Sequence, residues 1–158
     1  MANAKLLELQ GKFDEAVAIY NSLLEKPFEA SQMASIEFAL AQLLALTGKD
    51  IDRAIALIDE AVQKFPNDIT LRDTRALVYM RSKERTKTDQ AMDDLKYVLV
   101  MKDDPMFHFH LAVLYWNRAN VNAARIAFEK AKRLDPFLIQ NISALEVPDF
   151  TELSNNLQ

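Results

Sequence analysis

The sequence predicts an all-α protein in which antiparallel helix hairpins stack into a curved solenoid. Glycine is scarce, with 2 residues in 158, and half of the residues are hydrophobic. This composition favours helices over tightly turned strands. Between Phe107 and Pro136, apolar residues recur at intervals of three, four and seven, the pattern of two amphipathic helices joined by a turn. The rest of the chain repeats this unit more loosely.

Alanines at regular spacing define four such units. In the second helices an alanine precedes a large side chain by four positions: Ala16 and Tyr20, Ala54 and Ile58, Ala91 and Leu95, Ala124 and Phe128. In the first helices an alanine precedes a large side chain by three: Ala4 and Leu7, Ala41 and Leu44, Ala76 and Tyr79, Ala112 and Tyr115. Helices approach closely only where the crossing residues are small. Because one hairpin cannot bury its apolar face alone, the four hairpins are expected to stack.

This pattern resembles the tetratricopeptide repeat, a helix–turn–helix unit of about 34 residues. The small first-helix residue of that family is matched by Ala41, Ala76 and Ala112, and the glycine of its turn by Gly11 and Gly48. The chain departs from the family at the later turns, where Lys83 and Ala119 stand. It also lacks the first-helix tryptophan, whose positions hold Glu37, Arg72 and His108. The resemblance implies a right-handed superhelical solenoid in which the first helices line a concave face.

The repeats set the expected domain organisation. We expect four hairpins at about 1–27, 28–66, 67–105 and 106–136, followed by a C-terminal capping segment at 137–158. The third unit is irregular, with about three extra residues expected in its turn, RSKERTKTD. The first unit is short before Gly11, so the chain is expected to begin inside a helix of a longer parent. The alternative is a naturally short first helix.

The C-terminal segment has too many apolar residues for a disordered tail. Pro148 and Asp149 favour the start of a helix, with Phe150, Leu153 and Leu157 on one face. No fifth repeat follows the fourth. We therefore expect this segment to pack on the second helix of the last hairpin and to cover it.

Composition excludes several classes of function. The net charge of −4 gives no general attraction to nucleic acid or to an anionic membrane. The absence of cysteine excludes disulfides and thiolate metal sites. No apolar run reaches the roughly 18 residues of a membrane span, and the first residues do not form a signal peptide. The default expectation for the compartment is the cytoplasm.

Candidate catalytic groups are few, and none forms a recognised motif. His108 and His110 lie two positions apart, so on a helix their rings point to different sides and do not share a metal ion. The acidic pairs are expected at helix starts, on a helix surface and in a loop: Asp50 with Asp52, Asp93 with Asp94, and Asp103 with Asp104. There is no phosphate-binding loop and no nucleophile motif. We expect no enzyme activity, no cofactor and no metal.

The resemblance implies a peptide-binding groove on the concave face. The positions that face this groove in the family correspond to residues in the first helices of the second, third and fourth units: Phe38, Gln42, Ala45, Asp73, Leu77, Met80, Arg81, Phe109, His110, Val113, Trp116 and Asn117. Trp116 is a plausible anchor because aromatic residues dominate binding hot spots. The alternative is that the capping segment covers it. The leading hypothesis is a non-enzymatic scaffold that binds a protein or peptide partner.

Other functions remain open. The chain could be a structural spacer or a self-association module of a larger repeat protein, with weak homo-oligomers forming through its terminal repeats. Some relatives hold the C-terminal carboxylate of heat-shock chaperones with lysines and asparagines, but this chain lacks that set. The basic residues at 81–87 form either a solvated loop or a docking patch for an acidic partner: Arg81, Lys83, Arg85 and Lys87.

Overall fold

The computed structural model describes residues 1–82 and 84–157, and within these ranges the only regular elements are helices. Eight helices make up the repeats: α1 (Ala2–Leu9), α2 (Phe13–Leu24), α3 (Ala30–Thr47), α4 (Ile51–Lys64), α5 (Ile69–Arg81), α6 (Arg85–Met101), α7 (Pro105–Asn117) and α8 (Val121–Leu134). Two more follow: α9 (Leu138–Asn141) and α10 (Val147–Asn156). The predicted all-α class is confirmed.

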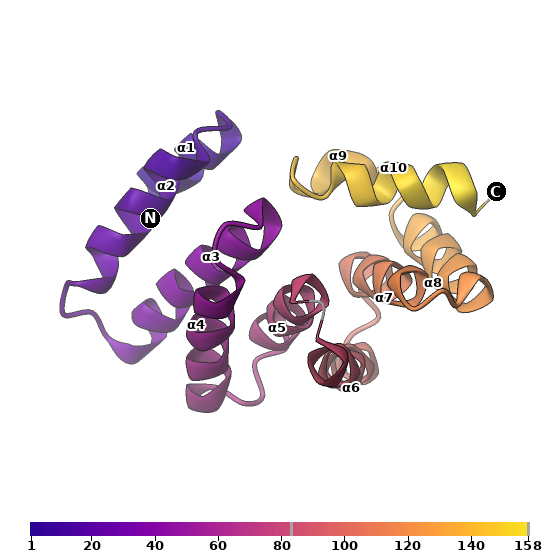
Figure 1. Cartoon of the computed structure of the whole chain (residues 1–158), viewed down its shortest axis with the longest axis horizontal. Helices are drawn as coiled ribbons and strands as arrows, with labels where there is room; N and C mark the ends of the chain where they lie inside the picture. The colour runs from indigo at the N-terminus through magenta and orange to yellow at the C-terminus, as the bar shows by residue number, and fades with distance from the viewer. Residues whose placement is uncertain (83, 158) are drawn as a thin grey trace.

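The helices pair in sequence and form a curved solenoid. Helices α1 and α2, α3 and α4, α5 and α6, and α7 and α8 make antiparallel hairpins, and each hairpin packs on the next. Helices α3, α5 and α7 lie on the inner side of the arc, while α4 and α6 lie on the outer side (Figure 1). The C-terminal helices α9 and α10 return to the inner side, facing α1 and α2 across the opening.

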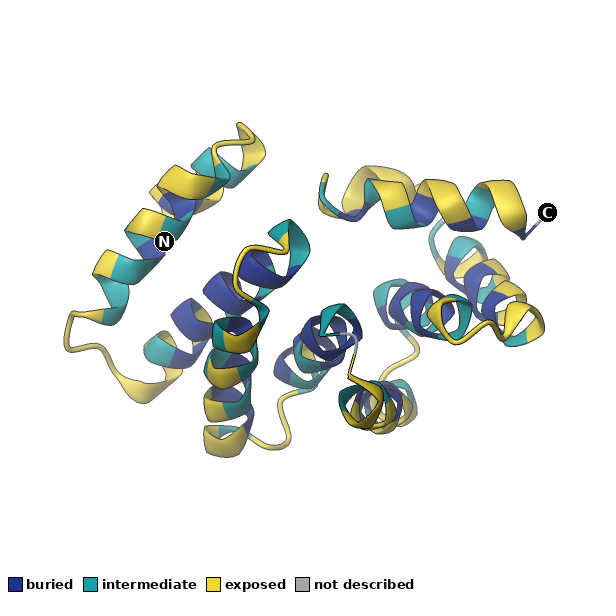
Figure 2. Cartoon of the chain, in the orientation of Figure 1, coloured by how far each residue is buried: buried dark blue, intermediate teal, exposed yellow. Residues whose placement is uncertain are grey.

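The alanines that defined the repeats are the best-buried residues of the hairpins. All eight have 0% exposure: Ala4, Ala16, Ala41, Ala54, Ala76, Ala91, Ala112 and Ala124. Burial runs as a stripe along the faces where helices meet, with exposed residues outside it (Figure 2). A larger side chain at these positions would overpack the crossing, at about 1–3 kcal/mol.

Short polar side chains begin four of the helices. Asp50, Asp68, Asp104 and Asn120 each accept a hydrogen bond from a backbone N–H in the first turn of the helix that follows. Such caps satisfy N–H groups that have no partner within the helix. They are worth about 1 kcal/mol each and fix where α4, α5, α7 and α8 start.

The third hairpin differs from the prediction. Its turn contains no long insertion, because helix α6 already begins at Arg85. The residues expected as extra loop form an additional first turn of helix, in which Thr88 Oγ1 donates to the carbonyl of Glu84 at 2.9 Å. Helix α6 is therefore 17 residues long, against 14 for α4 and α8. Lys83 lies outside the described residues.

The C-terminal segment does not hang free, but the predicted packing partner was wrong. Helix α10 packs mainly on α7, the first helix of the last hairpin, rather than on α8. It touches α8 through the Phe150 ring, and just beyond its end the carbonyl of Leu157 accepts from Arg125 Nε at 3.2 Å. The reason is chemical, since the acidic side chains of the segment find their partners on α5 and α7.

Helices long and apolar enough to span a membrane do not occur among the described residues.

The turns of the first, second and fourth hairpins each contain a residue in the left-handed conformation. Gly11 and Gly48 have φ of 72° and 67°, which glycine adopts without strain. Ala119 takes the same conformation, with φ of 57°, although it has a side chain. A left-handed alanine costs about 1–2 kcal/mol. The turn of the fourth hairpin therefore stores strain that the first two avoid.

Replacing Ala119 with glycine should relieve this strain. We expect Ala119→Gly to stabilise the protein by about 0.5–1 kcal/mol, after the larger entropy of glycine in the unfolded chain is subtracted. The matched control is Gly48→Ala, which should destabilise by about 1 kcal/mol. The new Cβ of that control would meet nothing within 4 Å, so the effect comes from the backbone alone. Urea unfolding midpoints measure both, and an unchanged midpoint for Ala119→Gly would contradict the expectation.

Candidate protein-binding surface

The inner side of α5 and α7 carries the main polar cluster of the concave face. We call this surface the α5–α7 face and define it by Asp73, Arg81, Phe109, His110 and Trp116. All five were among the residues predicted to line the groove. In the structure they do not face open solvent together, because α10 lies across them.

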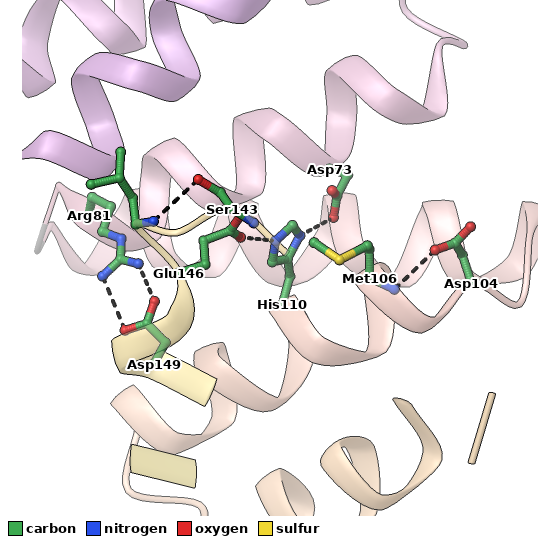
Figure 3. A network of polar contacts seen from close by, with 9 residues as sticks. Asp73, Arg81, Asp104, Met106, His110, Ser143, Glu146 and Asp149 are labelled. Carbon is green, nitrogen blue, oxygen red and sulfur yellow. Dashed lines mark hydrogen bonds and ion pairs between the residues drawn. The ribbon is translucent and has the colours of Figure 1, made fainter. Parts of the chain in front are cut away.

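A buried histidine lies at the centre of the α5–α7 face. His110 is 2% exposed, and its two ring nitrogens point at carboxylates on opposite sides (Figure 3). Nδ1 lies 2.7 Å from Asp73 Oδ1 on α5, and Nε2 lies 2.9 Å from Glu146 Oε1 at the start of α10. Glu146 is itself buried, and its second oxygen accepts from the backbone N–H of Ser143 at 3.3 Å. One imidazole thus joins α5, α7 and the C-terminal segment.

Two more polar contacts hold α10 along the same face. The guanidinium of Arg81, at the end of α5, forms an ion pair with the carboxylate of Asp149 (Figure 3). The indole N–H of Trp116, on α7, donates to Glu152 Oε1 at 2.8 Å. Both contacts are partly exposed, so each contributes less than the buried His110 pair. Their value lies in fixing the position and direction of α10.

An aromatic side chain anchors α10 between the last two repeat helices. The ring of Phe150 lies 5.9 Å from that of Phe109 on α7 and 5.0 Å from that of Phe128 on α8, in an edge-to-face arrangement with the latter. Leu153 and Leu157 follow on the same side of α10 and are 1% and 3% exposed. Burying a large apolar side chain is worth about 1.5–3 kcal/mol. Phe150 and Leu153 are thus the buried apolar residues of α10, and Leu157 adds to them just beyond its end.

The charges around His110 set its protonation. Burial by itself lowers the pKa of His110, but the carboxylates of Asp73 and Glu146 outweigh it and raise the pKa to about 10. Burial would raise the pKa of Glu146, yet the hydrogen bond and charge of His110 hold that pKa below its ordinary value. At neutral pH His110 is thus a buried cation between two carboxylates, with both N–H groups donating.

Beside α10 the concave face stays open. A cleft of about 440 Å3 runs between α1, α3 and the segment at 140–146. Its apolar lining comes from both sides, with Leu9, Leu43 and Leu46 opposite Ile142 and Leu145. Amide side chains also line it, namely Gln42, Gln140 and Asn141. The cleft therefore combines an apolar floor with groups that both donate and accept hydrogen bonds.

The charged groups at the α1 end of this cleft are paired within the protein. Glu8 accepts from Lys5 Nζ at 3.0 Å and from the hydroxyl of Tyr20 at 2.6 Å. Burial and the Glu8 carboxylate raise the pKa of Tyr20, so the hydroxyl keeps its proton and donates. A ligand of this cleft would thus meet little net charge.

The predicted groove residues fall into three groups. Seven are buried: Ala45, Asp73, Leu77, Met80, Phe109, His110 and Val113. Two more, Arg81 and Trp116, are half-buried and bonded to α10. The remaining three are accessible but lie apart. Gln42 lines the open cleft, Phe38 lines a hollow of about 400 Å3 between α3 and α5, and Asn117 lines one of about 460 Å3 with Met80 and Arg81.

The partners of this face on the C-terminal segment were not selected from the sequence. Glu146, Asp149 and Glu152 supply the polar contacts, and Phe150 supplies the aromatic anchor. Their spacing of three residues was the available signal, because residues three apart share one face of a helix. The sequence analysis used only the apolar residues of this segment.

Several of the groups considered for catalysis have structural partners. His108 Nε2 lies 2.6 Å from Asp103 Oδ1, on a different side of α7 from His110. Asp94 is buried and accepts from Arg72 at 2.8 Å and from Arg75 at 2.7 and 2.8 Å, which ties α5 to α6. Among the described residues, no group of three or more acidic or histidine side chains is arranged to hold a metal ion.

Comparison with known proteins identifies the repeats. Family models described as tetratricopeptide repeat match residues 1–69 and residues 107–137. The chain belongs to the tetratricopeptide repeat family. Tetratricopeptide repeats are in general a non-enzymatic scaffold for protein–protein interaction, and this chain has that architecture. A search of curated protein sequences finds no match.

Solved structures with a similar fold match over almost the whole chain. TTC0263, described as a thermophilic TPR protein in Thermus thermophilus, is similar with a TM-score of 0.76 and 14% identity, over 99% of this chain and 89% of that one. The structure named MamA MSR-1 C2 is similar with a TM-score of 0.61 and 18% identity, also over 99% of this chain and 89% of that one. At this identity the likeness concerns the fold alone.

The buried His110 predicts how stability depends on pH. Its folded pKa lies above the ordinary value of 6.5, so its contribution is complete below about pH 6.5 and is lost as the pH rises through about 10. The contribution of Glu146, with a lowered pKa, is present above its ordinary pKa and is lost as the pH falls. The free energy of unfolding should therefore fall by roughly 1 kcal/mol per pH unit between pH 7 and 9.

Urea unfolding at several pH values measures this slope. The double variant Asp73→Asn with Glu146→Gln should flatten it, because burial without the two carboxylates keeps His110 neutral. Glu25→Gln, which changes an exposed carboxylate at the end of α2, should leave it as in the wild type. A double variant with the wild-type slope would show that other groups cause the pH dependence.

Proposed function

We propose that this chain is a non-enzymatic scaffold that binds an extended peptide segment of a partner protein in the open cleft of its concave face. The observation that carries the proposal is the cleft itself, about 440 Å3 between α1, α3 and residues 140–146. Its lining comes from α1, α2, α3 and α7 together with residues 140–146. No group of described residues offers a competing metal centre.

The lining of the cleft indicates the chemistry of the peptide. Leu9 is 81% exposed and Leu46 is partly buried, so an apolar side chain of a partner would find contacts on both. The amides of Gln42 and Gln140 line the same cleft and can exchange hydrogen bonds with a peptide backbone. Because Lys5, Glu8 and Tyr20 satisfy one another, an uncharged peptide fits better than a highly charged one.

Selection from a library of displayed peptides tests this proposal. Peptides with apolar residues should be enriched on the wild-type protein. We expect Gln42→Arg to weaken their binding about ten-fold or more, because it puts a charge into a nearly neutral cleft and removes an amide. The matched control is Gln63→Arg, the same change at an exposed position on α4. Equal binding to both variants, measured by titration calorimetry, would contradict the proposal.

A second candidate function, self-association, is favoured by apolar side chains exposed at both ends of the array. Leu6 on α1 is 54% exposed, while Ile126 on α8 and Phe137 beyond it are 71% and 64% exposed. Repeat arrays stack end to end through such surfaces. Sedimentation equilibrium over a concentration series distinguishes the two functions. A mass that rises in the wild type but not in Ile126→Lys would support association through α8, and a monomer at all concentrations would exclude it.

A further inference from the structure

The acidic side of the C-terminal segment repeats with the spacing of a helix face. Glu146, Asp149 and Glu152 lie three positions apart, and each meets a donor on the α5–α7 face: His110, Arg81 and Trp116, respectively. Donors and acceptors are thus in register along the two surfaces. Such complementarity fixes the orientation of a bound helix and discriminates against helices of the opposite charge.

The apolar contacts of α10 are also spaced as on one face of a helix. Phe150 enters between Phe109 and Phe128, and Leu153 follows one turn later on the same side. An amphipathic helix that places apolar residues at such intervals into a groove is a common mode of peptide recognition. The α5–α7 face therefore holds α10 in the way that a receptor holds a helical ligand.

Removing α10 would change both the charge and the apolar exposure of the α5–α7 face. Removing the helix takes away Glu146 and Asp149, the anionic partners of His110 and Arg81. It also uncovers the rings of Phe109 and Phe128. The uncovered face would present an apolar strip flanked by two cations and an indole donor, which suits an acidic amphipathic helix.

The packing of α10 makes an exchange possible. Residues 135–146, which include α9, connect α8 to this helix. Its outer side is exposed, at Thr151, Asn155 and Asn156. Among the described residues, no other helix packs over that outer side, so α10 can leave without unfolding the repeats.

We propose that the α5–α7 face is a receptor for an acidic amphipathic helix, and that α10 is its built-in occupant, displaced when a partner helix of the same chemistry binds. The partner would carry acidic residues three apart and an aromatic residue next to the middle one, as in Glu146, Asp149, Phe150 and Glu152. This inference rests on the proposed function in so far as both use the concave face. It concerns side chains of α5 and α7 that do not line the Gln42 cleft, namely Arg81, His110 and Trp116, although Glu146 borders both surfaces.

A tethered helix competes with any partner. Its effective concentration is in the millimolar range for a short linker, so the apparent affinity of a partner falls by the fraction of time that the face is covered. Weakening the attachment of α10 should therefore strengthen the binding of an added helix.

The test uses the full chain and a synthetic peptide with residues 143–157 of this sequence. Asp149→Lys places a cation against Arg81 and should weaken the attachment of α10. We expect the peptide to bind this variant at least about ten-fold more tightly than the wild type, as measured by fluorescence anisotropy. A control peptide in which Glu146, Asp149 and Glu152 are replaced by glutamine should bind at least about ten-fold more weakly.

Further variants test whether the peptide binds specifically to the α5–α7 face. Phe150→Ala weakens the anchor without changing charge and should also increase peptide binding, provided that circular dichroism shows the repeats intact. Arg81→Glu should reduce binding of the acidic peptide and favour a peptide carrying lysine at position 149. Gln63→Arg, at an exposed position on α4, should leave peptide binding unchanged. Arg81 does not line the Gln42 cleft, so Arg81→Glu should leave the binding of library-selected peptides to that cleft unchanged, which separates this inference from the proposed function.

Equal binding of the acidic and glutamine peptides to folded Asp149→Lys would overturn the proposal, as would no binding at all. A dimer in which two copies exchange α10 and bind no peptide would also overturn it and assign the face to self-association.

Discussion

The close approach of helices at buried alanines is the constraint on which the whole structure depends. Ala112 on α7 and Ala124 on α8 have no exposed surface, and equivalent alanines occupy every hairpin. Only a small side chain lets the two helices of a hairpin come within about 8–10 Å of each other. Repetition of this crossing stacks the hairpins into an arc, and the arc brings α3, α5 and α7 to one inner surface. The concave face is thus a consequence of these small residues.

Within the described residues, α10 rather than another repeat hairpin packs on the inner side of the fourth hairpin. The chain uses its own C-terminal helix, but it lays that helix on the inner face rather than on the end. Apolar burial at Phe150 accounts for much of the attachment, while His110 determines where the helix lies. A buried cation is stable only when anionic groups lie beside it. The carboxylates of Asp73 and Glu146 lie on two sides of the His110 ring.

Most of the fold could be predicted from the sequence because its determinants are local. The spacing of the alanines predicted where the helices of each hairpin cross, and Gly11 and Gly48 predicted two of the turns. The additional first turn of α6 was missed because its polar residues are typical of a loop, and Ala119 shows that a left-handed turn can form without glycine.

The surface was harder to predict, since its geometry depends on residues far apart in the sequence. The repeat positions that face the groove in the family predicted three concave-face residues: Arg81, His110 and Trp116. Their partners lie 36 or more positions further along the chain, and no local pattern links His110 to Glu146 or Arg81 to Asp149. The expected contact of the cap with α8 followed from apolar residues alone. In the structure, α10 lies where its acidic side chains pair with groups on α5 and α7.

The central claim is that α10 lies on the α5–α7 face in the folded protein. Nuclear Overhauser effects between aromatic side chains in the full-length protein test it most directly. The structure predicts cross-peaks from the ring protons of Phe150 to those of both Phe109 and Phe128, whose centroids lie 5.9 and 5.0 Å away. A Phe150 ring without these cross-peaks, in a protein whose α7 and α8 resonances show the expected contacts with each other, would contradict the account.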